Sequence, residues 1–315
     1  MKTPQLIAMV HVHSNNALQN TIYNDGFGVT TYAPGDLAAI DLLRRQFHET
    51  LAELTEKTGL DLFNQCRTAV LLTDPALADE LAAGFAELPF VQRLIQRAVK
   101  DVGIYEGNGI THVAIENVGA PYFIGNEVPV EDMEVMYLVA HAVRKEYPKM
   151  NIGIHVLSSN ELEALPIALS CNALFVRSES AMFSGFRPEG KTINRGNLAK
   201  FYYMRNYLSA LMGKEESSER RRPALWADFQ KKHTVFEAGI QNLAVWLDNI
   251  VFQKLEGIIL TGAETGSDIG SGELQQAREA IDRAAAQIQR QSGREVMIPL
   301  ITGSGLDLPI YKKYA

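Results

Sequence analysis

Side chains that can transfer protons or bind anions stand at the ends of several short apolar runs in this chain. Each run has the length and the strand-forming residues of a buried strand, and each ends in polar residues. The endings are His11 and His13, Glu116 and Asn117, His155, Arg177, Asp228 to His233, and Thr261. Because the same arrangement recurs, we expect one site that is shared by many strands.

The segments between these runs have helical periodicity, so the chain predicts an α/β fold. Strands that alternate with helices are typical of a parallel sheet, and catalytic groups in a parallel barrel lie where strands end and loops begin. We count seven strands, whereas a closed barrel of this class has about eight. The sequence therefore predicts a TIM (β/α)8-type barrel, one domain over residues 1–315, with its last strand missing from this chain.

The expected elements follow one another in a regular order. The strands are expected in residues 5–12, 111–117, 151–160, 173–180, 223–228, 257–262 and 296–305, and the helices in residues 90–107, 128–148, 161–172, 197–213, 239–255 and 273–291. Residues 181–196, AMFSGFRPEGKTINRG, are rich in glycine and predict a long loop.

Residues 14–88 predict an insertion between the first strand and its partner helix. A long loop leads to a helix that Asp36 caps and Gly59 ends, and a second, alanine-rich helix follows from Pro75. We expect a homo-oligomer through this insertion, because the barrel alone has no place to bury two apolar-faced helices. The run Thr68 to Thr73 could cover the sheet edge left by the missing strand, and a further C-terminal segment is the alternative.

The composition excludes several classes of protein. With 46% apolar and 21% charged residues, the chain is an ordinary globular protein. No apolar run approaches the roughly 20 residues that cross a bilayer, and the start of the chain lacks the pattern of a signal peptide, so we expect a cytoplasmic protein. The two cysteines, Cys66 and Cys171, lack metal-ligand spacing and are expected to be reduced thiols. A net charge of −7 argues against a nucleic-acid partner.

Six short blocks, all in register, resemble the BtpA/SgcQ family. They are residues 5–12 with His11, IYEGNGITHVAIENVGAPYF, HVLSSNELEALPIALSCNALFVR, ADFQKKH, ILTGAETG and PLITGSG. The family is regarded as a TIM barrel related to ribulose-phosphate-binding barrels, and the resemblance implies that fold here. The matching positions are His11, Glu116, Asn117, Arg177, Asp228, Lys232, His233, Thr261, Gly262, Thr265, Gly266, Gly303, Ser304 and Gly305.

The chain departs from the family pattern at several positions, so it resembles a divergent member. It has His155, Ser158 and Asn160 where the family pattern has Asn, Arg and Asp. It also has Gln230 in place of His and Glu179 in place of Asn.

Glu116 and Asp228 end apolar strands, where an ionised carboxylate needs a partner. One interpretation is a structural ion pair with Arg177 or Lys232. The other is acid/base catalysis with Glu116, Asp228, Lys232, His233 and Arg177 as the catalytic group, or a divalent metal bound by histidines and these carboxylates. On the second interpretation we expect Glu116, Arg177, Asp228 and Lys232 to converge on one pocket, with His11, Asn117, His155 and Thr261 beside the substrate.

The glycine-rich segments TGAETG and TGSG predict a phosphate site. Absent side chains let backbone N–H groups approach an anion, and the barrel rim after the last strands is the usual phosphate cradle. We expect Gly303, Ser304 and Gly305 to bind the phosphate, assisted by Gly262 and Thr265, and we place Gly266 among the substrate-binding residues. Simple tight turns are the alternative.

Two classes of function therefore stay open. The first is an enzyme that acts on a small phosphorylated metabolite, a sugar phosphate or nucleotide, by acid/base or metal-assisted chemistry at the C-terminal mouth of the barrel. The second is a non-catalytic barrel that serves as a scaffold or as an assembly or regulatory factor. Charged groups on several strands favour the enzyme, because a scaffold has no need of them inside a barrel mouth.

Overall fold

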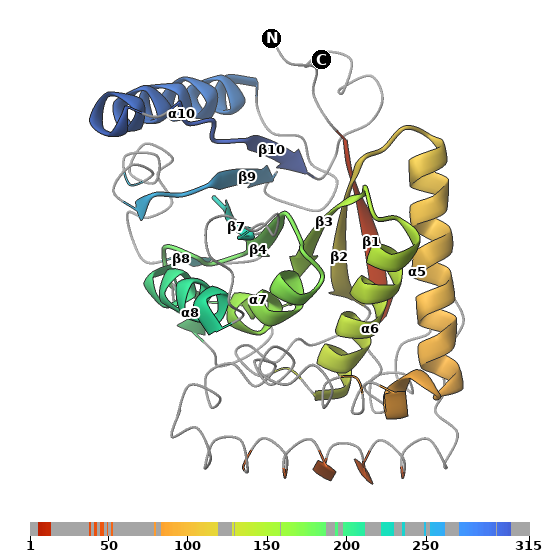
Figure 1. Cartoon of the computed structure of the whole chain (residues 1–315). Helices are drawn as coiled ribbons and strands as arrows, with labels where there is room; N and C mark the ends of the chain where they lie inside the picture. The colour runs from red at the N-terminus through yellow and green to blue at the C-terminus, as the bar shows by residue number, and fades with distance from the viewer. Residues whose placement is uncertain are drawn as a thin grey trace. The chain divides into compact units, whose positions relative to one another are not determined.

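A computed structural model of the chain describes most of the segments that carry the predicted strands and helices (Figure 1). The described residues are 6–13, 83–118, 128, 130–157, 159–186, 193–194, 198–211, 222–229, 235–236, 253–261, 271–293 and 295–303, with isolated positions from 38 to 79 and at 249. The chain divides into two compact units. The first unit comprises residues 5–176 and 201–223, and the second unit comprises residues 1–4, 177–200 and 224–315.

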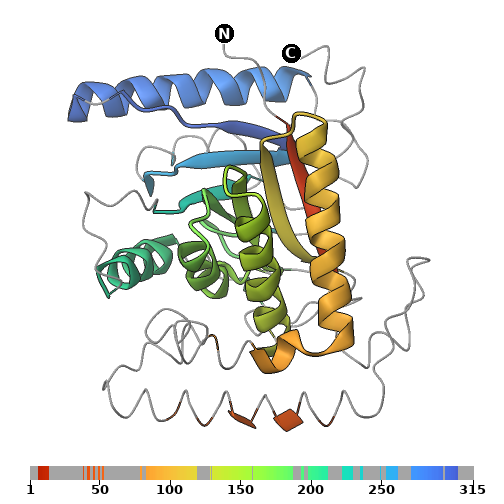
Figure 2. The ribbon, with the colours of Figure 1, turned by 45° about the vertical axis from the view of Figure 1, so that its right-hand side comes forward.

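The first unit contains parallel strands that alternate with helices. Strand β1 (Ile7–His13) pairs with β2 (His112–Val118), β2 pairs with β3 (Asn151–His155), and β3 pairs with the start of β4 (Phe175–Ser178). Helices α5 (Pro89–Gly107) and α6 (Val130–Glu146) lie side by side along β1 and β2 (Figure 2). Helix α7 (Glu161–Ser170) packs against β3. This repetition of strand and helix is the expected α/β pattern.

The second unit also contains parallel strands. The boundary between the units falls inside β4, after Val176. Strand β7 (Ala224–Asp228) pairs in parallel with β9 (Gly257–Thr261), and β9 pairs in parallel with β10 (Leu300–Gly303). The strand order is β1-β2-β3-β4 in the first unit and β4-β7-β9-β10 in the second, since β4 contributes residues to both. Helix α10 (Ser271–Ser292) lies beside β10, and α8 (Leu198–Leu211) crosses from one unit to the other after Lys200.

Three short strands form a second, antiparallel sheet that the sequence did not predict. Strand β5 (Gly185–Phe186) pairs with β6 (Ile193–Asn194) on one side and with β8 (Val235–Phe236) on the other. The prediction of a plain loop over residues 181–196 was wrong at these positions. Each strand has two residues, too short for the alternation of polar and apolar side chains to be visible in a sequence.

Glycine allows close packing at two places in the parallel sheet. The rings of Phe175 and Trp226 lie over Gly153 and Gly257 of the paired strands, where any side chain on the glycine would collide with the ring. Both rings are buried and form part of the core of their unit. The packing of each ring on the neighbouring strand therefore requires glycine at the position under the ring.

The coarse prediction of an α/β protein with a TIM-like alternation of parallel strands and helices is confirmed. The helices α5, α6, α7, α8 and α10 lie where the periodicity predicts them. Positions 38, 41–42, 45–46, 49 and 52 are helical, within the first helix expected in the insertion. The rest of that insertion up to residue 82, apart from position 79, and most of the helix expected at 239–255 lie outside the described residues. No helix in the described part of the chain is both long and apolar enough to cross a membrane.

Candidate functional site

Three residues with ionisable side chains are paired on adjacent strands of the first unit. His11 of β1 is paired with Glu116 of β2, and Glu116 is paired with His155 of β3. Paired residues on neighbouring strands point to the same face of a sheet, because side chains alternate along every strand. His11, Glu116 and His155, from here on called the β1–β3 row, therefore share one face at the C-terminal ends of their strands.

The members of the β1–β3 row differ in their access to solvent. His155 Nδ1 lies 3.1 Å from Glu116 Oε1, and the side chains are 1% and 13% exposed respectively. His11 is exposed. A ligand on this face would therefore meet His11 and Glu116, while His155 lies behind the Glu116 carboxylate. A carboxylate backed by an imidazole can accept or donate a proton, and the imidazole stabilises its negative charge when it is protonated.

Asn117 belongs to the opposite face of the sheet, because it follows Glu116 on β2. Its Oδ1 accepts a hydrogen bond from the Leu157 backbone N–H at 2.6 Å, and its Nδ2 donates to the Leu157 carbonyl at 3.3 Å. The residue is 2% exposed. Its side-chain amide is thus directed at the backbone just after β3, although we predicted it beside the substrate.

In the second unit, Arg177 and Asp228 form a bidentate ion pair. Arg177 Nε donates to Asp228 Oδ1 at 3.0 Å, and Arg177 Nη2 donates to Asp228 Oδ2 at 2.9 Å. The side chains are 21% and 1% exposed. Parallel bonds of this kind are among the stronger charge-assisted contacts. The ion-pair interpretation of Asp228 thus has a partner in Arg177, and catalysis by Asp228 stays a prediction.

The structure describes some of the remaining predicted residues, while others lie outside the described part of the chain. Thr261, expected beside the substrate, ends β9 and is paired with Gly303, an expected phosphate-site position and the last residue of β10. Lys232, His233, Gly262, Thr265, Gly266, Ser304 and Gly305 lie outside the described residues. His13 is the last residue of β1 and is paired with Val118. The convergence of Glu116, Arg177, Asp228 and Lys232 on one pocket therefore stays a prediction.

Nothing in the sequence distinguishes Glu134, yet its carboxyl group has unusual surroundings in the structure. It lies near the start of α6, is fully buried, and neither oxygen has a hydrogen-bond partner among the described residues. Burial raises its pKa to about 8. The sequence shows only an acidic residue in the first turns of a helix, which is common because the helix dipole favours it there. Only the burial of its carboxyl group in the folded protein distinguishes Glu134 from other acidic residues at helix starts.

The same helix makes a partly buried polar contact with α7. His141 Nε2 lies 3.0 Å from Ser170 Oγ, and Ser170 Oγ donates to the Ile167 carbonyl at 2.8 Å. The serine hydroxyl has its only hydrogen in that second bond, so His141 must donate its Nε2–H to Ser170. Next to Ser170, Cys171 is a free buried thiol, and burial raises its pKa to about 12. A thiol of this kind is not a nucleophile at neutral pH, while Cys66 lies outside the described residues.

A metal centre has no ready-made ligand set in the parts of the chain that the structure describes. No group of three or more His, Cys, Asp or Glu side chains is arranged there to hold an ion. Within the β1–β3 row, Glu116 and His155 are the two groups in direct contact.

Comparison with known proteins places these residues within a family. Residues 80–296 match the model of the BtpA family. An uncharacterized protein of Archaeoglobus fulgidus is 26% identical over 224 residues, which cover 71% of this chain and 78% of that protein. An uncharacterized protein of Pyrococcus horikoshii is 26% identical over 218 residues, 69% of this chain and 71% of the other.

The match to a eukaryotic relative covers a similar share of both chains. An uncharacterized mitochondrial protein of Caenorhabditis elegans is 22% identical over 222 residues, 68% of this chain and 69% of its own length. The family match includes β2, β3, β4, β7 and β9, and with them Glu116, His155, Arg177 and Asp228. This chain therefore belongs to the BtpA family.

Proposed function

We propose that this protein is an enzyme that acts on a small phosphorylated metabolite by acid/base chemistry, with Glu116 as the group that exchanges a proton with the substrate. The observation that supports it is the contact between Glu116 and His155, with His155 Nδ1 3.1 Å from Glu116 Oε1. A partly exposed carboxylate with a buried imidazole behind it is an arrangement suited to proton transfer.

The exposure of each residue suggests its role. Glu116 and His11 are accessible on the face of the β1–β3 row, so Glu116 would take or give the proton and His11 would contact the substrate. His155 is buried and would hold the carboxylate in place and stabilise its charge. In neutral His155, the carboxylate favours the tautomer with the hydrogen on Nδ1, because that nitrogen faces Glu116.

The phosphorylated substrate is supported by the sequence and not by a described contact. Gly303 and Thr261 end adjacent strands, and the glycine-rich residues that follow them could offer backbone N–H groups to an anion. Millimolar phosphate should then raise the melting temperature, and this measurement tests the anion site without reference to the reaction.

The experiment that tests the proposed function is a substrate screen in D2O. The protein is incubated with a panel of sugar phosphates and nucleotides, while 1H and 31P NMR follow loss of carbon-bound hydrogen and change at phosphorus. We expect at least one compound to be altered by the native protein, and Glu116→Gln to lower that rate by about 100-fold or more. His155→Asn should also lower it.

Two matched controls separate chemistry from damage to the sheet. Glu106→Gln changes an exposed glutamate at the end of α5, and His112→Asn changes a histidine at the opposite end of β2 from Glu116. Both variants should retain the native rate. If the native protein alters no compound of the panel but still binds phosphate, the result would instead favour the scaffold or regulatory role.

A further inference from the structure

The regular pairing of β2 with β3 ends at the last residue of β3. The ladder between the two strands ends at the pair of Glu116 and His155. Between β3 and α7, Ser159 has a positive φ of 53°. A non-glycine residue in that region is strained unless its surroundings hold it there.

Hydrogen bonds to Val156 and Leu157 hold the segment that follows β3. The Asn160 N–H donates to the Val156 carbonyl at 3.1 Å, which closes the turn on itself. The Asn117 amide binds both the N–H and the carbonyl of Leu157, at 2.6 and 3.3 Å. The contact with Asn117 joins the segment after β3 to β2. The Asn117 side chain thus replaces the ladder bonds that end at His155.

We propose that Asn117 is a positioning residue for the β1–β3 row: by fixing Leu157 it sets the end of β3 and so holds His155 against Glu116. The role of the row in catalysis rests on the proposed function, but the positioning itself does not. Asn117 is buried on the opposite face and next to Glu116 in sequence. It therefore ties the backbone that carries Glu116 to the backbone that follows His155.

The alternative is that Asn117 only stabilises the fold. A purely structural residue would change the free energy of unfolding and leave the imidazole of His155 in its native environment. A positioning residue changes that environment in the folded protein. The 15N chemical shifts of the two imidazole nitrogens report this directly, because they depend on which nitrogen carries the hydrogen and on its partner.

The experiment compares Asn117→Ala with Asn108→Ala. Asn108 is a matched control because its Nδ2 also donates to a backbone carbonyl, that of Ile104, at an exposed position that ends α5. In the folded Asn117→Ala protein we expect the Leu157 amide to exchange its hydrogen faster and the His155 15N signals to shift. In Asn108→Ala both should stay native.

Asn117→Asp keeps an oxygen for the shorter bond to the Leu157 N–H, and it serves if the alanine variant fails to fold. We expect it to keep the His155 signals closer to the native ones than Asn117→Ala does. Faster exchange at Leu157 with unchanged His155 signals in either folded variant would overturn the positioning role, even if the proposed function is correct.

A kinetic readout applies once a reaction is known. Asn117→Ala should lower kcat by about 100-fold, because displacement of a catalytic group by about 1 Å has an effect of that size. KM should change much less, because Asn117 lies on the face away from the ligand. If Asn117→Ala shifts the His155 signals but no compound is altered by the native protein, the positioning stands and the proposed function fails.

Discussion

At the scale of single residues, the surroundings of a charged group decide what it can do. Glu116, Asp228 and Glu134 are all carboxyl groups at strand ends or helix starts, and their sequence contexts differ little. In the structure, the first contacts a histidine, the second is held by an arginine, and the third is buried with no hydrogen-bond partner among the described residues. Each environment leads to a different expected effect of substitution.

Asp228→Asn should be strongly destabilising. It leaves the Arg177 guanidinium beside a neutral amide in a largely buried place, and breaking one side of such a pair costs about 3 kcal/mol. Urea unfolding measures the loss. The double variant Arg177→Met/Asp228→Asn, which removes the unpaired charge, should recover at least half of it. A loss in Asp228→Asn of less than about 1 kcal/mol, together with lost activity, would support a catalytic Asp228 instead.

Glu134 should make stability depend on pH. Its pKa is about 8 in the folded protein, against 4.5 in an exposed carboxyl, so between these pH values the folded chain keeps a proton that the unfolded chain releases. This contribution to stability is complete at acidic pH, falls by about 1.4 kcal/mol for each pH unit as the pH rises toward 8, and is constant above it.

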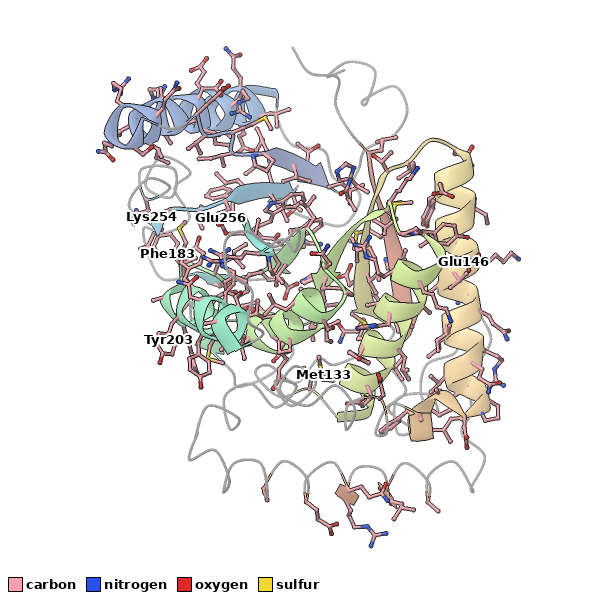
Figure 3. All side chains as sticks on the ribbon, viewed as in Figure 1. Met133, Glu146, Phe183, Tyr203, Lys254 and Glu256 are labelled. Atoms are coloured by element: carbon pink, nitrogen blue, oxygen red, sulfur yellow. The ribbon has the colours of Figure 1, made fainter. Side chains whose placement is uncertain are left out.

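Glu134→Gln removes this ionisation and should abolish the corresponding slope. Urea unfolding of the two proteins from about pH 5 to about pH 9 gives the difference directly. Glu146→Gln is the control, since Glu146 is exposed at the other end of α6, and Figure 3 shows it far from Met133, the neighbour of Glu134. Equal slopes in Glu134→Gln and the native protein would contradict a buried protonated Glu134.

At the scale of elements, side chains that bind backbone groups join one strand–helix unit to the next. Glu256 accepts a hydrogen bond from the Leu225 N–H at 2.9 Å and so connects the starts of β7 and β9 (Figure 3). Tyr105 of α5 donates to the Met9 carbonyl of β1 at 3.1 Å. Such contacts give backbone groups a hydrogen-bond partner on another element.

Arg144 of α6 is the most connected of these residues. Its guanidinium donates to the carbonyls of Cys171 and Asn172, which follow α7, and to those of Pro148 and Met150, which precede β3, at 2.8 to 3.2 Å. A cation is favourable at a helix C-terminus, and Asn172 there has a positive φ of 53°. Arg144 thus ties the end of α7 to the start of β3.

Arg144→Met should therefore lower the free energy of unfolding by about 2 to 4 kcal/mol, because several hydrogen bonds to a charged group are lost while the apolar stem remains. Thermal or urea unfolding measures the change. Arg97→Met on α5 is the control: its ion pair with Asp101, at 3.9 Å, is one turn of helix apart and partly exposed, so the loss should be below about 1 kcal/mol. Similar losses in both variants would contradict the structural role of Arg144.

At the scale of the whole molecule, the oligomeric state is a prediction that rests on the insertion. Leu42 lies at a helical position of the insertion and is exposed in the single chain. If that helix meets a second copy, the native protein should sediment as an oligomer and Leu42→Glu should dissociate it, since a charge is costly in an apolar contact. Ile104→Glu, at an exposed apolar position of α5, should leave the oligomer intact. A native monomer at all concentrations tested would rule out this contact.

The sequence by itself determined the alternation of strands and helices and the family. Periodicities of 2 and about 3.6 are local properties, so the positions of β1, β2, β3 and the helices could be predicted from neighbouring residues alone. The polar strand ends could be recognised for the same reason. Glu116 and His155 were among the predicted site residues before any contact between them was known.

Only the tertiary structure decided which of these residues meet. Register between strands depends on pairing of segments that are far apart in the chain, and a shift by one residue would have moved Glu116 away from the face of His155. The same holds for the Asn117 amide on the Leu157 backbone and for the Arg177–Asp228 pair. The burial of Glu134 likewise depends on what packs over α6, and no pattern along the helix itself records that.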